Sequence, residues 1–181
     1  YESMRKANES MYGQPLIPKV SFQQSDLIIS FGADFLETWL SPVEYANDFS
    51  QFHKFQNNRI GKMIYFGPAA TMTALNSDEF IVIRPGTEAA IIRALIQKLA
   101  QKGLLKTVGV DFYVDDDLPE KIRQKVDRIA TEIAQSHKPL ILAGKPEDAT
   151  EEGKEAVLAA NTLNHLLGND DLIDYSSGHV L

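Results

Sequence analysis

The chain has 181 residues, 44% of them hydrophobic, which is enough for one ordinary domain with a sizeable core. Its 25 acidic residues outnumber its 18 basic ones and give a net charge of −7, which excludes the clustered basic surface that nucleic-acid binding needs. The sequence contains no cysteine, so it forms no disulfide and no thiolate-ligated iron–sulfur centre. No apolar run approaches the roughly 18 residues that span a bilayer, and we expect no direct membrane insertion.

The first elements predicted are a helix and a connector. Apolar residues at helical spacing predict a helix over residues 1–11, ended by Gly13. The chain begins with Tyr1, inside this helix and without a secretory leader, so we expect it to be a fragment of a larger multidomain protein. Residues 14–24, which include two prolines, are predicted to be a connector.

Three short strands are predicted next, and each ends in a glycine turn. The strands cover residues 27–31, 62–66 and 80–83, and the turns contain Gly32, Gly67-Pro68 and Pro85-Gly86. An irregular helix, broken at Ser41-Pro42, is predicted over residues 35–49.

The second half of the chain is predicted to contain three helices and a strand. Thr87 is expected to cap the first helix, which Gly103 closes, and Asp117 with Glu120 forms a capping-box pattern ahead of the second. Residues 108–113 are either a loop or an edge strand. Residues 139–143 are predicted to be a buried strand, and a last helix is expected from Thr150 to its stop at Gly168.

Strands that alternate with helices in this way predict an α/β fold, a three-layer αβα arrangement around a Rossmann-like, mostly parallel sheet. We expect a single domain over residues 1–181. Within it, residues 1–24 form the first helix and connector, residues 25–104 carry the strand-end glycine turns, and residues 105–181 form a helix–strand–helix unit.

The glycine turns are the candidate binding elements. Ligands of open α/β sheets collect beyond the carboxyl ends of the strands, where backbone amides and helix N-termini attract anions. Glycine also lets the backbone approach a phosphate or sugar closely. The same glycines can equally be simple turn residues, and the turns by themselves leave that alternative open.

Three longer motifs carry a family resemblance. They are Ser25 to Asp34 (SDLIISFGAD), Gly61 to Ala74 with the sequence GKMIYFGP at its start and TMTA at its end, and Asp78 to Glu88 (DEFIVIRPGTE). Their order and spacing resemble the molybdopterin oxidoreductases, whose corresponding runs end in Gly-Ala-Asn, Asp-Pro-Arg with Thr-x-Thr-Ala, and Arg-Pro-Gly-Thr-Asp. The stretch from Phe31 to Tyr45 is most similar to the large iron–sulfur subunit of alternative complex III and related respiratory complexes.

The resemblance implies a domain of a redox subunit that holds the nucleotide part of a molybdenum bis-pterin cofactor, molybdopterin guanine dinucleotide. Iron–sulfur clusters would then lie outside this segment. The implied partners are other domains of the same chain and iron–sulfur or membrane subunits, in a membrane-associated complex on the periplasmic side. The residues matched to the cofactor-binding motifs are Gly32, Ala33, Asp34, Gly67, Pro68, Thr71, Arg84, Gly86, Thr87 and Glu88.

Several positions depart from the family pattern. Asp34 replaces the usual asparagine and puts an anion where a pyrophosphate would approach. Gly67 and Ala69 stand where the family has an acid and a base, so an acceptor and a cation are both missing. These changes support an alternative hypothesis, a cofactor-free structural or interaction domain of a membrane-associated respiratory complex. A free-standing dinucleotide-binding domain is a third hypothesis, although no Gly-x-Gly-x-x-Gly turn follows a strand.

No catalytic residue is predicted in this segment. Trp39 is expected to be a core or interface anchor, and the four histidines lack the spacing of metal ligands. The run Asp115 to Asp117 is better explained by helix capping than by cation binding, and Glu88 stabilises a helix start with or without a ligand.

Overall fold

A four-stranded parallel sheet forms the centre of the molecule in the computed structural model, which describes residues 1–55, 59–105, 118–145 and 147–179. The strands are β2 (Leu27–Phe31), β3 (Lys62–Gly67), β4 (Glu79–Val82) and β5 (Pro139–Ala143). Their order is β4-β3-β2-β5, so β2 pairs with both β3 and β5, and β4 and β5 are the edge strands. The predicted parallel sheet is confirmed.

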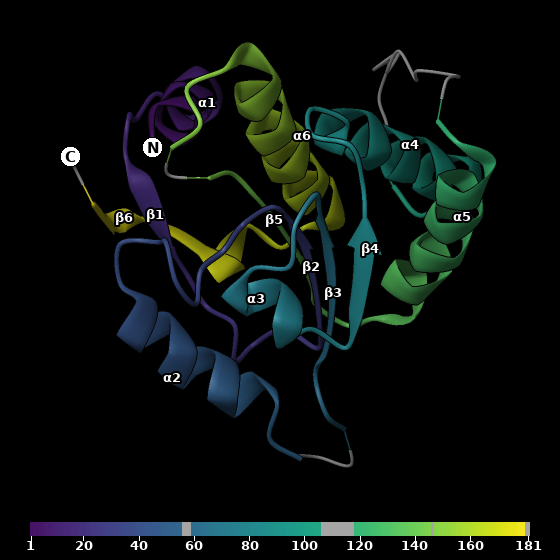
Figure 1. The fold of residues 1–181 in the computed structure, drawn as a ribbon, viewed down its shortest axis with the longest axis horizontal. Helices are drawn as coiled ribbons and strands as arrows, with labels where there is room; N and C mark the ends of the chain where they lie inside the picture. The colour runs from purple at the N-terminus through teal and green to yellow at the C-terminus, as the bar shows by residue number, and fades with distance from the viewer. Residues whose placement is uncertain (56–58, 106–117, 146, 180–181) are drawn as a thin grey trace.

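Helices cover both faces of this sheet (Figure 1). On one side lie α4 (Glu88–Gln101), α5 (Glu120–Gln135) and α6 (Glu151–Leu167). On the other lie α2 (Pro42–Phe52) and the single turn α3 (Met72–Leu75). This arrangement is the predicted three-layer αβα fold.

A small second sheet joins the two ends of the described chain. Strand β1 (Ile17–Val20) pairs antiparallel with β6 (Ile173–His179), and the 3₁₀ turn η1 (Asp170–Leu172) leads into β6. The N-terminal helix α1 (Glu2–Tyr12) is confirmed, and it packs against α6.

The predicted connector over residues 14–24 was wrong in part, because it contains β1. Two prolines argued against a strand, but Pro18 falls where the register shifts between Ile17 and Lys19, so its missing N–H interrupts no regular ladder. The polar sequence of β6 gave no alternation from which its strand could be predicted.

Other boundaries also needed correction. The helix predicted over residues 35–49 begins only at Pro42, which occupies the first turn of α2 and follows a stretch of turns. Helix α3 was not predicted, because four residues carry no periodicity. Residues 108–113 and Asp117 lie outside the described residues, and the N-cap of α5 is Pro119, which makes no side-chain cap bond.

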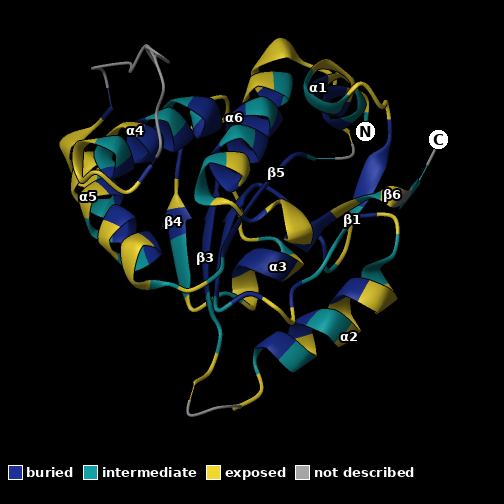
Figure 2. Cartoon of the chain, turned by 180° about the vertical axis from the view of Figure 1, so that it is seen from behind, coloured by how far each residue is buried: buried dark blue, intermediate teal, exposed yellow. Residues whose placement is uncertain are grey.

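The core lies between the sheet and its helices. Every residue of β2 and β5 is buried, whereas β4 has the exposed Val82 (Figure 2). Trp39 is buried in the core as predicted, and its Nε1 donates to the carbonyl of Gly144 at 3.3 Å. No helix in the described ranges combines the length and apolar character needed to cross a bilayer.

Candidate functional site

The three predicted glycine turns follow adjacent parallel strands. Gly32 follows β2, Gly67 ends β3, and Gly86 lies in the loop between β4 and α4. Because β4, β3 and β2 are neighbours and parallel, these turns lie at one edge of the sheet, as the sequence predicted.

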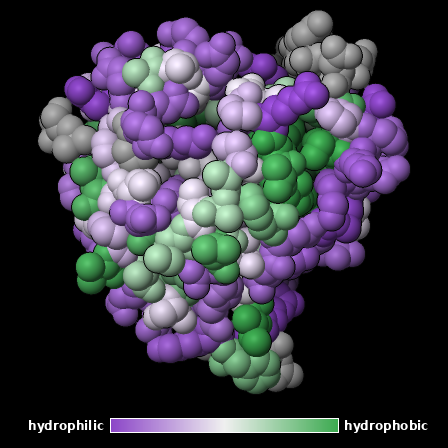
Figure 3. All heavy atoms as spheres, in the orientation of Figure 1, coloured by the Kyte–Doolittle hydropathy of each residue, from purple (hydrophilic) through white to green (hydrophobic). Residues whose placement is uncertain are grey.

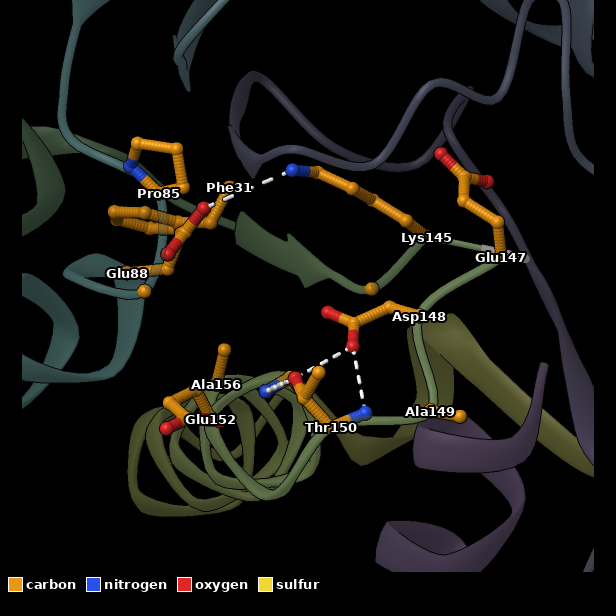
Figure 4. A pocket seen from close by; sticks show the side chains of 13 residues that line it. Phe31, Pro85, Glu88, Lys145, Glu147, Asp148, Ala149, Thr150, Glu152 and Ala156 are labelled. Atoms are coloured by element: carbon orange, nitrogen blue, oxygen red, sulfur yellow. Dashed lines mark hydrogen bonds and ion pairs between the residues drawn. The ribbon is translucent and has the colours of Figure 1, made fainter.

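A cavity of about 560 Å³ lies at this carboxyl edge, lined by the ends of β2 and β5 and by the loops that precede α4 and α6 (Figure 4). The strand order reverses between β2 and β5, and such a reversal is where open α/β sheets bind ligands. The lining residues are Phe31, Pro85, Gly86, Glu88, Gly144, Lys145, Glu147, Asp148, Ala149, Thr150, Glu152, Gly153 and Ala156. Only Gly86 and Glu88 of the predicted site residues are among them.

Glu88 and Lys145 face each other inside the cavity (Figure 4). Glu88, in the first turn of α4, is 8% exposed, and its Oε1 lies 3.9 Å from the Nζ of Lys145. The stem of Lys145 packs over Gly32, in the space that a Cβ at that position would occupy. The space beside the Gly32 backbone, where a ligand could have approached, is therefore filled by Lys145.

Asp34 is turned into the protein and away from the cavity. It is 5% exposed, and its Oδ1 accepts a hydrogen bond of 3.0 Å from the amide of Thr73 in α3. In return, the Thr73 hydroxyl accepts one of 3.0 Å from the amide of Leu36. Ala33, between Gly32 and Asp34, is fully buried, and its carbonyl accepts from Ser30. These bonds tie the loop after β2 to the start of α3.

The turn after β3 is also occupied by protein contacts. Gly67 leaves room for the ring of Tyr65, which a Cβ would meet at 2.6 Å. The Thr71 hydroxyl accepts from the amide of Ala74, capping α3, and lies 3.3 Å from the Tyr65 hydroxyl. Burial raises the pKa of Tyr65, against the opposing effect of that hydrogen bond. Pro68 is exposed beside this turn.

Arg84 and Thr87 line a different cavity, of about 490 Å³, beside the end of β4. The predicted capping role of Thr87 was wrong. Its hydroxyl donates to the carbonyl of Arg84 at 2.7 Å and makes no cap bond to α4, because the Thr87 backbone is already helical, with φ −94° and ψ −1°.

The N-terminus of α6 is capped from within the chain. The hydroxyl of Thr150 accepts from the amide of Gly153 at 3.1 Å, and the helix begins after Thr150 as predicted. Asp148 Oδ1 in turn accepts from the Thr150 amide at 2.8 Å, and the Asp148 carboxylate fills the space that a Cβ on Gly153 would need. A carboxylate of the protein thus lies at the helix end where an external anion would bind.

The charges around the cavity are mostly negative. The described part of its lining has four carboxylates, Glu88, Glu147, Asp148 and Glu152, and one cation, Lys145. A phosphate entering it would meet this excess of like charge in partly buried surroundings. No group of three or more His, Cys, Asp or Glu side chains within the described residues could hold a metal ion.

Several lining residues were missed from the sequence. The strand over residues 139–143 and the helix start at Thr150 were predicted, but nothing local indicated that β5 lies next to β2. Lys145, Asp148 and Gly153 enter the site only through that long-range pairing.

The chain matches no family model. It is 28% identical over 159 residues to the molybdopterin-binding-like subunit of menaquinone reductase from Nitratidesulfovibrio vulgaris, a match that covers 81% of this chain and 23% of that protein. The fold is similar to that of acetylene hydratase from Pelobacter acetylenicus, with a TM-score of 0.60 over 93% of this chain and 24% of the hydratase, at 18% identity. Both findings support the resemblance to the molybdopterin oxidoreductases that the motifs carry. The chain spans about a quarter of the length of either protein.

The residues around the cavity can be compared with what the pyrophosphate of a pterin dinucleotide requires. Such a group needs free amides at a helix N-terminus and cationic side chains. Here the amides of Thr150 and Gly153 are bonded within the chain, and Lys145, the one cation among the described lining residues, lies against Glu88. The lining residues therefore do not fit a pyrophosphate.

Replacement of Asp34 provides a test of its structural role. Asp34→Ala is expected to lower the free energy of unfolding by about 1 to 2 kcal/mol, because the buried amide of Thr73 loses its acceptor. Asp34→Asn keeps an acceptor oxygen and restores the family residue, so we expect a loss below about 1 kcal/mol. Chemical denaturation checks both, with the exposed neighbour Glu37→Ala as the control. Equal losses for the alanine and control variants would contradict the role.

Proposed function

We propose that this domain is a structural wall of a larger molybdopterin-oxidoreductase-type redox subunit and makes no phosphate contacts to a pterin nucleotide. The similarity to a subunit of menaquinone reductase supports placing it in a membrane-associated complex, with other domains of the same polypeptide and iron–sulfur or membrane subunits as partners. In that complex the domain supplies a rigid fold, and electron transfer uses centres outside these residues.

One observation carries the proposal, namely the Asp148 carboxylate beside Thr150 and Gly153 at the start of α6. An anion of the protein already takes the position that the helix dipole offers to a phosphate. Each charged hydrogen bond that a phosphate fails to make costs about 1.5 to 3 kcal/mol, so the loss of two weakens binding by several orders of magnitude.

A second candidate function is the one first implied by the motifs, in which the domain holds the nucleotide part of molybdopterin guanine dinucleotide. The position of the cavity at the reversal of strand order, with Lys145 in its lining, favours this candidate. For this function, a phosphate would have to bind close to the carboxylates of Glu88 and Asp148. Repulsion between these like charges is the argument against it.

Isothermal titration calorimetry of the full-length protein with guanosine diphosphate distinguishes the structural role from the nucleotide-binding role. We expect no saturable binding, and we expect molybdenum and pterin well below one per protein in the purified material. Saturable binding that Lys145→Ala abolishes and Glu88→Gln strengthens would overturn the structural proposal in favour of the nucleotide site. Lys154→Ala, a lysine of α6 outside the cavity lining, is the control.

A further inference from the structure

The two edge strands of the four-stranded sheet, β5 and β4, differ in the hydrogen bonds made by their outer edges. At β5, the side chain of Asn164 accepts from the amide of Ile141 at 2.9 Å and donates to its carbonyl at 2.8 Å, and Asn169 donates to the carbonyl of Pro139. The outer edge of β5 is thereby closed by side chains. Within the described ranges, no strand or side chain hydrogen-bonds to the outer edge of β4.

The groups left open on β4 belong to Phe80 and Val82. The amide of Ile83 donates to the carbonyl of Gly67 in β3, and in a parallel ladder the residues on either side of an inward-facing residue point outward. The amides and carbonyls of Phe80 and Val82 therefore face away from the sheet. Val82 is 65% exposed. An unpaired edge with an apolar side chain is a template for another strand.

The surroundings of this open edge are apolar, with positive charge at one end. Figure 3 shows hydrophobic side chains gathered on the side of the molecule where β4 lies. Among the described residues, the cavity of about 490 Å³ beside the end of β4 is lined mostly by apolar side chains, together with Thr87, Arg84 and Lys121, and by no acidic one. The other end of β4 follows Asp78, whose side chain is 46% exposed. A strand that pairs with this edge is therefore expected to have an acidic residue next to Arg84.

The sequence of β4 fits its own open edge in the antiparallel direction. Pairing centred on Ile81 places Phe80 opposite Val82 of a second copy, with the outward amides and carbonyls exchanging hydrogen bonds across the pair. The same register places Arg84 opposite Asp78 of the second copy, and the two-fold axis repeats each contact. An aromatic residue thus faces a β-branched one, which is a favourable cross-strand pair. Arg84 comes to face the half-exposed carboxylate of Asp78, whose Oδ2 also accepts from the amide of Met63 at 2.7 Å and lies 3.4 Å from His53 Nε2.

We propose that β4 pairs with β4 of a second copy of this chain and joins two sheets into one continuous sheet of eight strands. The interface is isologous, and Phe80, Val82 and Arg84 are its determinants. The inference deepens the structural role proposed above, but its test measures association and not nucleotide binding, so either proposal can fail alone. Because the paired strand is short, we expect a dissociation constant in the micromolar range.

Sedimentation velocity across a range of concentrations tests the dimer with two matched variants of the full-length protein. Val82→Lys places a charge next to the centre of the pairing, opposite Phe80, and we expect at least about a tenfold rise in the dissociation constant. Val43→Lys makes the same change at an 84% exposed valine on α2, and we expect no more than about a twofold change. Arg84→Glu sets like charges against Asp78 of the second copy, and we expect about a threefold to tenfold rise.

Hydrogen exchange gives an independent readout on the same samples. The amides of Phe80 and Val82 should exchange more slowly as the protein concentration rises, whereas the amide of Ile83, already bonded to Gly67, should not respond. A protein that stays monomeric with fast exchange at Phe80 and Val82 overturns the proposal. So does slow exchange at these amides in a monomer, since another part of the polypeptide would then cover the edge.

Discussion

Replacing Asn164 by leucine is expected to lower the free energy of unfolding by about 3 kcal/mol. Asn164 is fully buried and satisfies both the amide and the carbonyl of Ile141 on the edge of β5. Leucine has a similar volume but no polar group, so two buried backbone groups would lose their partners, at about 1 to 3 kcal/mol each. Chemical denaturation followed by circular dichroism measures the change.

The control for this variant is Asn47→Leu, the same substitution at an exposed position of α2. We expect it to change stability by less than about 0.5 kcal/mol. Asn164→Asp retains the acceptor for the Ile141 amide but loses the donor to the Ile141 carbonyl, so its effect should be intermediate. A loss for Asn164→Leu no larger than that of the control would show that Asn164 does not close the edge of β5.

The second large effect is expected at Gly144, which joins β5 to the wall of the cavity. Its φ is +110°, a region that residues with a side chain rarely adopt, and a Cβ would lie 2.7 Å from Met4 Cγ and 3.0 Å from Val157 Cγ2. Gly144→Ala should therefore cost about 3 kcal/mol, from backbone strain together with overpacking between α1 and α6.

Gly13→Ala separates these two contributions. Gly13 also has a positive φ, +72°, but a Cβ there would meet nothing within 4 Å. Its replacement should cost only about 1 kcal/mol, the usual price of the left-handed conformation. If denaturation gives equal losses for the two variants, the contacts with Met4 and Val157 carry none of the effect. A smaller cost of Gly144→Ala in a Met4→Ala background would support the clash.

The sequence predicted the central sheet well because its signals are local. The apolar runs of β2, β3 and β5 and the glycines after them identify strands and turns without knowledge of the rest of the chain. Helices α4, α5 and α6 have apolar faces several turns long, so they too were recognised. Strand β1 was missed because its pairing with β6 depends on residues at the far end of the sequence.

The candidate site was harder to predict for a related reason. The glycine turns of the motifs lie at the carboxyl edge of the sheet, but the cavity opens between β2 and β5, and sequence patterns do not give the order of strands. Asp34 was interpreted as an anion facing a ligand, whereas its carboxylate is buried against the amide of Thr73. A side chain's direction depends on which backbone donor lies near it in space, and α3 supplies that donor.

The pairing of β1 with β6 and of α1 with α6 has a consequence for biosynthesis. Ile17 lies opposite His179, so contacts of the N-terminal elements are completed by residues synthesised almost at the end of this segment. Such distant contacts slow folding, since the intervening chain must first be brought together. We therefore expect α1 and β1 to emerge from the ribosome without their partners and to dock last, after the central sheet has formed.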